Sequence, residues 1–155
     1  MQASWSRILA SYLGERSVTF GVVLAGRTSD ETADSPFPCL VTLPIVTEAE
    51  DSNMGLLQNM MAYNSNLYKH QFNPLAEVKK WLGHPASPIF DTVLVYQKTS
   101  GPHLNTDQWK LMEDLPSVEY SVSLEVEPLE DEQLHLRLTT RSDIVPHEQA
   151  ELMLK

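Results

Sequence analysis

The first residues of the chain place apolar side chains at the spacing of an amphipathic helix. The residues on this apolar side are Trp5, Ile8, Leu9, Tyr12 and Leu13. Gly14 follows them, and glycine commonly ends a helix because it adopts the left-handed backbone conformation without strain. The pattern therefore predicts a helix that ends at Gly14.

Two strands are predicted after this helix. Residues 16–27 form an apolar segment, and its uninterrupted apolar run at 22–25 is typical of a strand covered on both faces. Residues 28–38 are polar and contain proline, so we expect a loop there. The second strand is expected over 39–46. Pro44 lacks a backbone N–H, so this strand should be irregular or lie at the edge of the sheet.

Two helices and a strand are predicted next. Asp51 or Ser52 is expected to cap a helix, and Asn73-Pro74 to begin a shorter one that ends at Gly83. Apolar side chains repeat at helical spacing along both helices, so we expect them to pack in the core. They are Leu56, Leu57, Met60, Met61, Leu67 and Tyr68 in the first helix, with Asn64 on the same face, and Leu75, Val78, Trp81 and Leu82 in the second. Residues 89–97 are predicted to form a strand.

The clearest local pattern is strict alternation of apolar and polar residues in two segments near the end of the chain. The apolar positions are Val118, Tyr120, Val122, Leu124 and Val126, and then Leu134, Leu136 and Leu138. This alternation predicts an antiparallel hairpin with one dry and one solvated face. Pro146 is expected to open a final helix. The order of elements predicts an α/β two-layer sandwich with a mixed sheet.

Composition and charge limit the function. The net charge is −10, from 21 acidic against 11 basic residues. Such a surface repels phosphate groups, so neither nucleic acid nor an anionic membrane is expected as a partner. Ordinary solubility explains the acidity, and attraction for a basic partner is the alternative. No stretch has the length of a membrane span, and the single cysteine excludes an internal disulfide, so we expect a cytoplasmic protein.

The reactive side chains form no clear catalytic or metal-binding pattern. Cys39 with a histidine would be a nucleophile pair, but a lone cysteine beside Leu40 is more typical of a small core residue. His103 and Asp107 are four residues apart, but the proline and asparagine around them oppose the helix that would align them on a metal. We therefore predict no catalytic residue and no metal site.

Five segments in series resemble the C-terminal half of a condensation domain from a nonribosomal peptide synthetase. They are Trp5–Gly14, Phe20–Arg27, Val41–Val46, His70–Leu75 and Ile89–Gln97. Their order and spacing follow the family, and the hairpin and last helix match its final elements. Phe37-Pro38 and Tyr96-Gln97-Lys98 resemble fungal siderophore synthetases most. Residues 1–155 are thus identified as the C-terminal lobe of such a domain, truncated within its last helix.

The resemblance implies one lobe of a fold like that of chloramphenicol acetyltransferase and other CoA-dependent acyltransferases. Family members join an acyl or peptidyl donor to an amine acceptor, both held on carrier domains. The implied partners are therefore carrier domains and the N-terminal lobe, and 4'-phosphopantetheine is carried by the former, with no cofactor bound to this chain. The catalytic signature His-His-x-x-x-Asp-Gly belongs to the N-terminal lobe and is absent from this sequence.

The resemblance also suggests which residues border the tunnel for substrates and carriers. They are Arg27, Thr42, His70 and Asp91. Each has a structural alternative: Arg27 pairs with an acid at the strand end, His70 satisfies a helix end, and Asp91 satisfies backbone groups at a strand start. Val41 and Val46 stand where the family has asparagine and arginine, which removes hydrogen-bonding groups expected near the tunnel.

Three interpretations of function follow. The first is a condensation lobe that contributes to amide formation but is inactive alone, because the histidine motif is missing. The second is a non-catalytic module that docks carrier domains or a partner lobe through an exposed apolar surface. The third is a degraded gene product without function.

Overall fold

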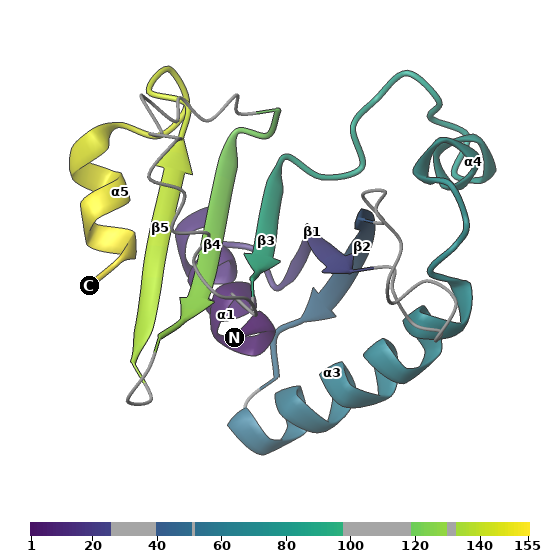
Figure 1. Cartoon of the computed structure of the whole chain (residues 1–155), viewed down its shortest axis with the longest axis horizontal. Coiled ribbons are helices and arrows are strands. Elements are labelled where there is room, and N and C mark those ends of the chain that lie inside the picture. Colours follow the sequence, from purple (N-terminus) through teal and green to yellow (C-terminus); the bar gives the residue numbers. More distant parts are fainter. Residues whose placement is uncertain (26–39, 51, 98–118, 130–132) are drawn as a thin grey trace, which may run out of the picture. The chain divides into compact units, whose positions relative to one another are not determined.

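The computed structural model describes residues 1–25, 40–50, 52–97, 119–129 and 133–155 (Figure 1). These residues form two compact units, 1–94 and 95–155, and the boundary falls within strand β3 (Thr92–Tyr96). The predicted loop over 28–38, with Arg27 and Cys39 beside it, lies outside the described residues, as do His103 and Asp107.

The first unit begins as the sequence predicts. Helix α1 (Gln2–Leu13) ends at Gly14, whose φ of 67° is left-handed. Strand β1 (Ser17–Ala25) pairs with β2 (Leu40–Glu48) in antiparallel register, with Phe20 opposite Ile45. Within this unit β1 lies between β2 and β3. The predicted edge position of the proline-containing strand is therefore confirmed.

The other helices of the first unit lie between β2 and β3 in sequence. They are α3 (Asn53–Leu67), the 3-10 turn η1 (Tyr68–His70) and α4 (Leu75–Trp81). Ser52 caps α3, because its hydroxyl oxygen accepts a hydrogen bond of 2.9 Å from the Gly55 N–H. Pro74 occupies the cap position of α4, and Gly83 follows that helix with a φ of 76°. Both predicted helix starts are thus confirmed within one residue.

The Ser52 cap gives a direct test of this local structure. We expect Ser52→Ala to lower the free energy of unfolding by about 1 kcal/mol, because the substitution leaves one N–H of the first turn without an acceptor. Ser65→Ala, at an exposed position inside the same helix, is the control and should be neutral or slightly stabilising. Urea titration of both variants measures the difference. Equal stability of the two would contradict the capping role.

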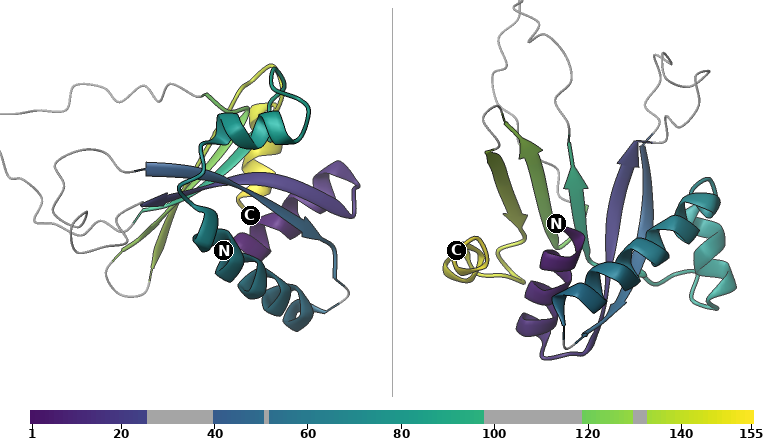
Figure 2. Two further views of the ribbon diagram at one scale, coloured as in Figure 1. Left: turned by 90° about the vertical axis from the view of Figure 1, so that its right-hand side faces the viewer. Right: turned by 90° about the horizontal axis from the view of Figure 1, so that it is seen from below.

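The core of the first unit lies where α1 and α3 pack side by side on one face of β1 and β2 (Figure 2). Its buried apolar side chains are Trp5, Leu9, Val18, Phe20, Val22, Leu43, Ile45, Leu56 and Met60. On the opposite face, the ring of Phe90 lies against Gly21, where a Cβ would sit 2.4 Å from Phe90 Cε2. The prediction that β1 is covered on both faces is therefore confirmed at Gly21.

Half of the apolar side chains that were predicted to pack in the core from α3 and α4 are exposed. The exposed fractions are 47% for Leu57, 71% for Met61, 49% for Tyr68, 68% for Trp81 and 56% for Leu82. The prediction that these side chains pack inside is wrong. The inward face of α3 is instead completed by polar groups that bond to the rest of the unit. The Tyr63 hydroxyl donates to the Pro44 carbonyl at 3.3 Å, and the Asn64 amide donates to Gln2 Oε1 at 2.6 Å.

The second unit contains the predicted hairpin. Strands β4 (Val122–Pro128) and β5 (Leu134–Thr140) are antiparallel, with Leu124 opposite Leu138 and Val126 opposite Leu136. Val122, Leu124 and Val126 of β4 are buried and the residues between them are half-buried, as the alternation predicts, whereas Leu134 and Leu136 of β5 are 49% and 43% exposed. The dry face of the hairpin is thus confirmed on β4 and only partly on β5.

The end of β3 and the last helix complete this unit. The Gln97 N–H donates to the Val126 carbonyl at 3.0 Å, and Figure 1 draws β3 and β4 in the same direction, so the sheet is mixed as predicted. Pro146 caps α5 (His147–Met153), which contacts β5. That the chain is truncated within this helix stays a prediction. None of the described helices is long and apolar enough to cross a membrane.

Candidate functional site

Three of the four candidate tunnel residues lie in the first unit. Thr42 is half-buried in β2, opposite Val23 of β1. His70 is an exposed residue of η1, and Asp91 is exposed directly before β3. Arg27 lies outside the described residues. No hydrogen bond or ion pair among the described residues joins these three side chains, so the structure assembles no acid–base pair from them.

The sheet register nevertheless places Thr42 on the sheet face that the Phe90 ring covers. Thr42 lies on the same face of β2 as Pro44, which is opposite Gly21, and the Phe90 ring covers Gly21 on that face. Asp91 directly follows Phe90 in the chain. Thr42 therefore shares the sheet face that the Phe90 ring covers, whereas Asp91 is near that ring only by its place in the chain. His70 belongs to a different place, the connection between α3 and α4.

The structural alternative for His70 involves its backbone. The His70 carbonyl accepts a hydrogen bond of 3.0 Å from the Asn73 N–H and closes the turn before α4. The neighbouring Gln71 is the buried member of the pair, at 6% exposure, and its side-chain oxygen has no partner within the described ranges. The His70 imidazole thus lies at the surface, whereas the side-chain amide of Gln71 is buried.

Val41 and Val46 do not remove hydrogen-bonding groups from one common place. The two residues are five apart, so the alternation of β2 puts them on opposite faces. Val41 shares the face of the buried Leu43 and Ile45. Val46 shares the face of Thr42 and is 47% exposed. Of the two valines, only Val46 therefore presents an apolar side chain on the sheet face of Thr42.

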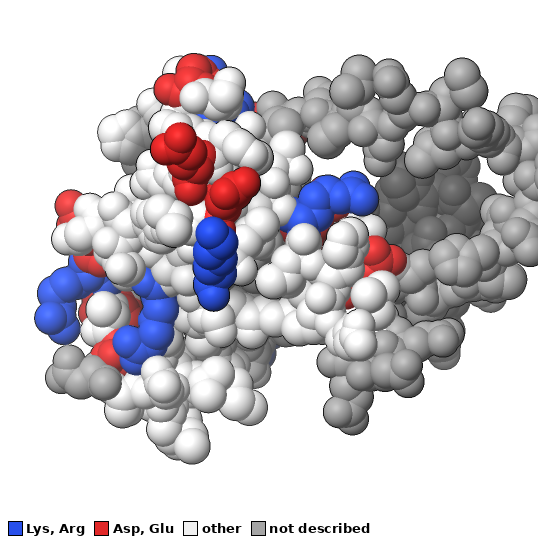
Figure 3. Space-filling view, turned by 90° about the vertical axis from the view of Figure 1, so that its left-hand side faces the viewer, with Lys and Arg blue, Asp and Glu red and all other residues white. Residues whose placement is uncertain are grey.

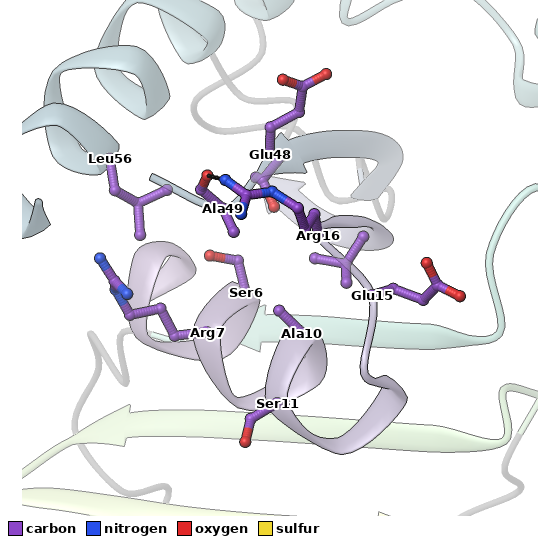
Figure 4. A pocket seen from close by; sticks show the side chains of 11 residues that line it. Ser6, Arg7, Ala10, Ser11, Glu15, Arg16, Glu48, Ala49 and Leu56 are labelled. Atoms are coloured by element: carbon purple, nitrogen blue, oxygen red, sulfur yellow. Dashed lines mark hydrogen bonds between the residues drawn. The ribbon is translucent and has the colours of Figure 1, made fainter. Parts of the chain in front are cut away.

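A cavity of about 280 Å³ opens between α1 and the ends of β1 and β2 (Figure 4). Arg7 donates to the Glu50 carbonyl at 2.9 Å, and Arg16 donates to the Ala49 carbonyl at 3.4 Å. Both guanidinium groups thus hold the connection from β2 to α3. The sequence gives no sign of this cavity, because residues of four separate elements, α1, β1, β2 and α3, line it. No group of three or more potential metal ligands occurs among the described residues.

The charged side chains of the second unit form pairs across and beside the hairpin. Arg137 lies 3.6 Å from Glu125 and His135 lies 3.7 Å from Glu127, each directly opposite in register. Figure 3, which looks from the side of α5 in Figure 1, shows acidic and basic groups interspersed among uncharged surface. The described residues of this face show no field of a single sign that would attract a polyanion. The absence of nucleic-acid and membrane partners stays a prediction.

The exposed ion pair of Arg141 and Asp143, which follows β5, gives a prediction about pH dependence. A hydrogen bond from Arg141, at 2.7 Å, lowers the pKa of Asp143 below its ordinary value of 3.8. A carboxyl group whose pKa is lowered by folding stabilises the folded state at pH values above its ordinary pKa. This stabilisation is lost as the pH falls through the pKa of the folded state. We expect Arg141→Gln to raise the pKa of Asp143 toward 3.8, followed by NMR titration of its carboxyl carbon. The control, Arg137→Gln, should leave that pKa unchanged, and an unchanged pKa in both would contradict the pairing.

A second candidate region, which we call the basic aromatic segment, covers residues 68–84. It carries Lys69, Lys79 and Lys80 with a single acidic residue, Glu77, in a chain whose net charge is −10. Glu77 pairs with Lys80 at 2.7 Å. The same segment exposes the large side chains of Tyr68, Phe72, Trp81 and Leu82. Trp81 is exposed and not in the core as its helical spacing predicts, and the adjacent Lys79-Lys80 pair is the sequence signal of an exposed helix face.

The fold and these segments define the class of protein. The family model of the condensation domain matches residues 1–144. The chain therefore belongs to the condensation domain family. It is 54% identical along its whole length to part of nonribosomal peptide synthetase 2 of Gibberella zeae. It is 29% identical over 157 residues, 99% of this chain, to the hydroxamate-type ferrichrome siderophore peptide synthetase of Schizosaccharomyces pombe. The chain spans 3% of the length of each of these proteins.

Solved structures share the fold at low sequence identity. A four-domain nonribosomal peptide synthetase superposes with a TM-score of 0.83 at 14% identity, covering 99% of this chain and 13% of that chain. A variant of the starter condensation domain of the rhizomide synthetase has a TM-score of 0.74 at 17% identity, covering 99% of this chain and 38% of that chain. The predicted fold class, a lobe of the acetyltransferase-like fold, is confirmed by these likenesses.

Proposed function

We propose that residues 1–155 are the C-terminal lobe of a condensation domain that forms amide bonds in a fungal siderophore synthetase. The observation that carries this proposal is the 54% identity to a nonribosomal peptide synthetase along the whole chain. The siderophore assignment draws support from the ferrichrome synthetase relative. In the proposed reaction, the amine of the acceptor attacks the donor thioester, an amide bond forms, and the carrier thiol leaves.

In this proposal the chain shapes the passage for substrates and leaves the proton transfer to another segment. Thr42, on the sheet face of the Phe90 ring, and the exposed Asp91 and His70 border the passage, and the family resemblance assigns Arg27 to it as well. A histidine of the absent His-His-x-x-x-Asp-Gly motif would act on the attacking amine. The phosphopantetheine arms belong to carrier domains, so this chain needs no cofactor of its own.

The test is deletion within the parent synthetase. Removing residues 1–155 from the full polypeptide is expected to abolish amide formation, while each carrier is still loaded with its aminoacyl or acyl group. Mass spectrometry of the carriers separates the two steps. Undiminished amide formation after the deletion would overturn the proposal.

A second candidate function is docking of a carrier domain by the basic aromatic segment. Exposed aromatic residues beside cations are the side chains that dominate protein interfaces, and such a surface fits an acidic partner with an apolar contact. Lys79 is the better candidate for a contact than Lys80, because Glu77 already neutralises Lys80 at 2.7 Å. Trp81, at 68% exposure, would supply the apolar contact.

Carrier binding by this chain tests the second function. We expect Trp81→Ala and Lys79→Glu each to weaken binding of the parent's carrier domain by about tenfold, since a buried interface tryptophan contributes more than 1 kcal/mol. Leu154→Ala, at another exposed apolar position, is the control and should bind normally. NMR titration of the labelled carrier gives the Kd. Wild-type affinity in both variants would exclude the segment as the docking surface.

A further inference from the structure

Two arginines of the first unit differ from the arginines of the second unit in how their charge is balanced. Arg137 and Arg141 each form an ion pair with a carboxylate, at 3.6 and 2.7 Å. Arg7 and Arg16 form no ion pair within the described ranges, although acidic residues outnumber basic ones by 21 to 11. No described carboxylate therefore lies in contact with either of these two guanidinium groups.

Arg7 and Arg16 line the same cavity, the one of about 280 Å³ between α1 and the ends of β1 and β2. Each guanidinium donates one hydrogen bond to a backbone carbonyl of the connection from β2 to α3, and no second bond to a described residue. A guanidinium group has five N–H donors and no acceptor. Both groups therefore keep donors that are available to a ligand in the cavity.

The acidic residues of the cavity wall are turned away from these donors. Glu15 and Glu48 belong to the lining, and Figure 4 shows their carboxylates directed away from the other labelled side chains. The Arg16 guanidinium instead turns toward Ala49, as the dashed hydrogen bond in Figure 4 shows. Like charges that border one cavity repel each other, and an anion held between them removes this repulsion. The electrostatics of the cavity thus favour an anionic ligand.

The size and the remaining wall of the cavity are suited to an organic anion. A water molecule requires about 10–15 Å³ of cavity volume, so a single carboxylate or phosphate group fills only part of a space of about 280 Å³. The apolar residues of the wall are Ala10, Val18, Ala49 and Leu56, and its hydroxyl residues are Ser6, Ser11 and Thr47. A ligand with a short apolar body beside its charged group fits such a wall.

We infer that this cavity binds a small organic anion, whose carboxylate or phosphate group lies between Arg7 and Arg16 and whose apolar body contacts Ala10 and Leu56. The planar donors of arginine match the oxygens of both head groups, and such charge-assisted hydrogen bonds are stronger than neutral ones. A polymeric anion is a poorer ligand, because the net charge of −10 repels it over the rest of the surface. The inference concerns the first unit by itself and does not depend on the proposed function.

Titration of the full chain of 155 residues with two anions that share one ring tests the inference. Phenyl phosphate and benzoate carry the two head groups on the same ring, and benzyl alcohol is the uncharged control. NMR follows the backbone amides of the labelled chain at constant ionic strength. We expect saturable shifts at Ser6, Arg16 and Ala49, with a Kd of about 1 mM for the tighter anion, because exposed ion pairs are weak. Benzyl alcohol should cause no such shifts, and the tighter anion identifies the preferred head group.

Variants assign the binding to the two guanidinium groups. Arg7→Gln and Arg16→Gln each remove charge-assisted hydrogen bonds and should weaken binding of the tighter anion about tenfold. Arg137→Gln removes the same charge from the second unit and is the matched control, with an unchanged Kd. Arg16→Lys keeps the positive charge and should bind more tightly than Arg16→Gln. Unchanged amide signals away from the cavity show that each variant is folded.

Two outcomes would overturn the inference. The first is the absence of saturable shifts at the cavity amides up to about 20 mM of either anion. The second is an equal loss of affinity in Arg16→Gln and Arg137→Gln, because the anion would then respond only to the overall charge of the chain. Both outcomes concern ligand binding by the first unit, so a failure here leaves the proposed role in amide formation intact.

Discussion

Replacing Gly21 by alanine is expected to lower the free energy of unfolding by about 1–3 kcal/mol, the cost of overpacking a filled core. The added Cβ would lie 2.4 Å from Phe90 Cε2 and 2.9 Å from Phe90 Cδ2, well inside van der Waals contact. The Phe90 ring cannot shift into solvent to make room, because Phe90 is only 6% exposed. Alanine would otherwise be the better residue in a strand interior, so a loss of stability reports the contact with Phe90.

A double-mutant cycle isolates this contact. Phe90→Leu removes ring atoms and is destabilising alone, but it makes room for the alanine side chain. We therefore expect the double variant Gly21→Ala, Phe90→Leu to cost less than the sum of the two single variants, in denaturant unfolding followed by circular dichroism. Simple additivity of the two changes would show that the ring does not lie against Gly21 in solution.

The second large effect is expected at Phe20, whose side chain is 0% exposed. Phe20→Ala should lower the free energy of unfolding by about 3–5 kcal/mol, because it removes apolar burial and leaves a cavity. Phe72→Ala is the matched control, with the same chemical change in the same unit. Phe72 is 67% exposed, so its replacement should change stability by no more than about 0.5 kcal/mol.

This pair also separates stability from docking. If Phe72 belongs to a docking surface, Phe72→Ala weakens partner binding and leaves the unfolding transition in place. Thermal unfolding of both variants, scanned under one buffer condition, gives the comparison. A large loss of stability in Phe72→Ala would mean that the basic aromatic segment packs inside the unit, contrary to the structure.

The sequence predicted the elements well because their signals are local. Gly14 ends α1, Ser52 caps α3, and the alternation around Leu124 and Leu138 sets the register of the hairpin. Each of these depends on backbone geometry or on neighbours within a few residues. The resemblance of five segments then supplied the fold class, which periodicity alone does not specify.

The exposure of α3 and α4 was predicted wrongly because burial depends on which face meets the sheet. Met60 and Met61 are adjacent and equally apolar, yet one is 6% and the other 71% exposed. Helical spacing allowed either to point inward. Asn64 was predicted on the face of Leu56 and Met60, but no apolar pattern indicates that Tyr63 completes this face with a polar contact. The candidate site had the same difficulty, because Thr42 and Phe90 share one sheet face only through strand pairing between distant segments.

The most direct test of the central claim is a reconstitution of amide formation from separate parts. Acyl donor and amine acceptor are loaded on the parent's carrier domains, and mass spectrometry measures the amide product. The samples contain this chain alone, the segment bearing His-His-x-x-x-Asp-Gly alone, and the intact condensation domain. We expect product only from the intact domain. Product formed by residues 1–155 alone would contradict the account, because the account assigns catalysis to the His-His-x-x-x-Asp-Gly motif and this chain lacks that motif.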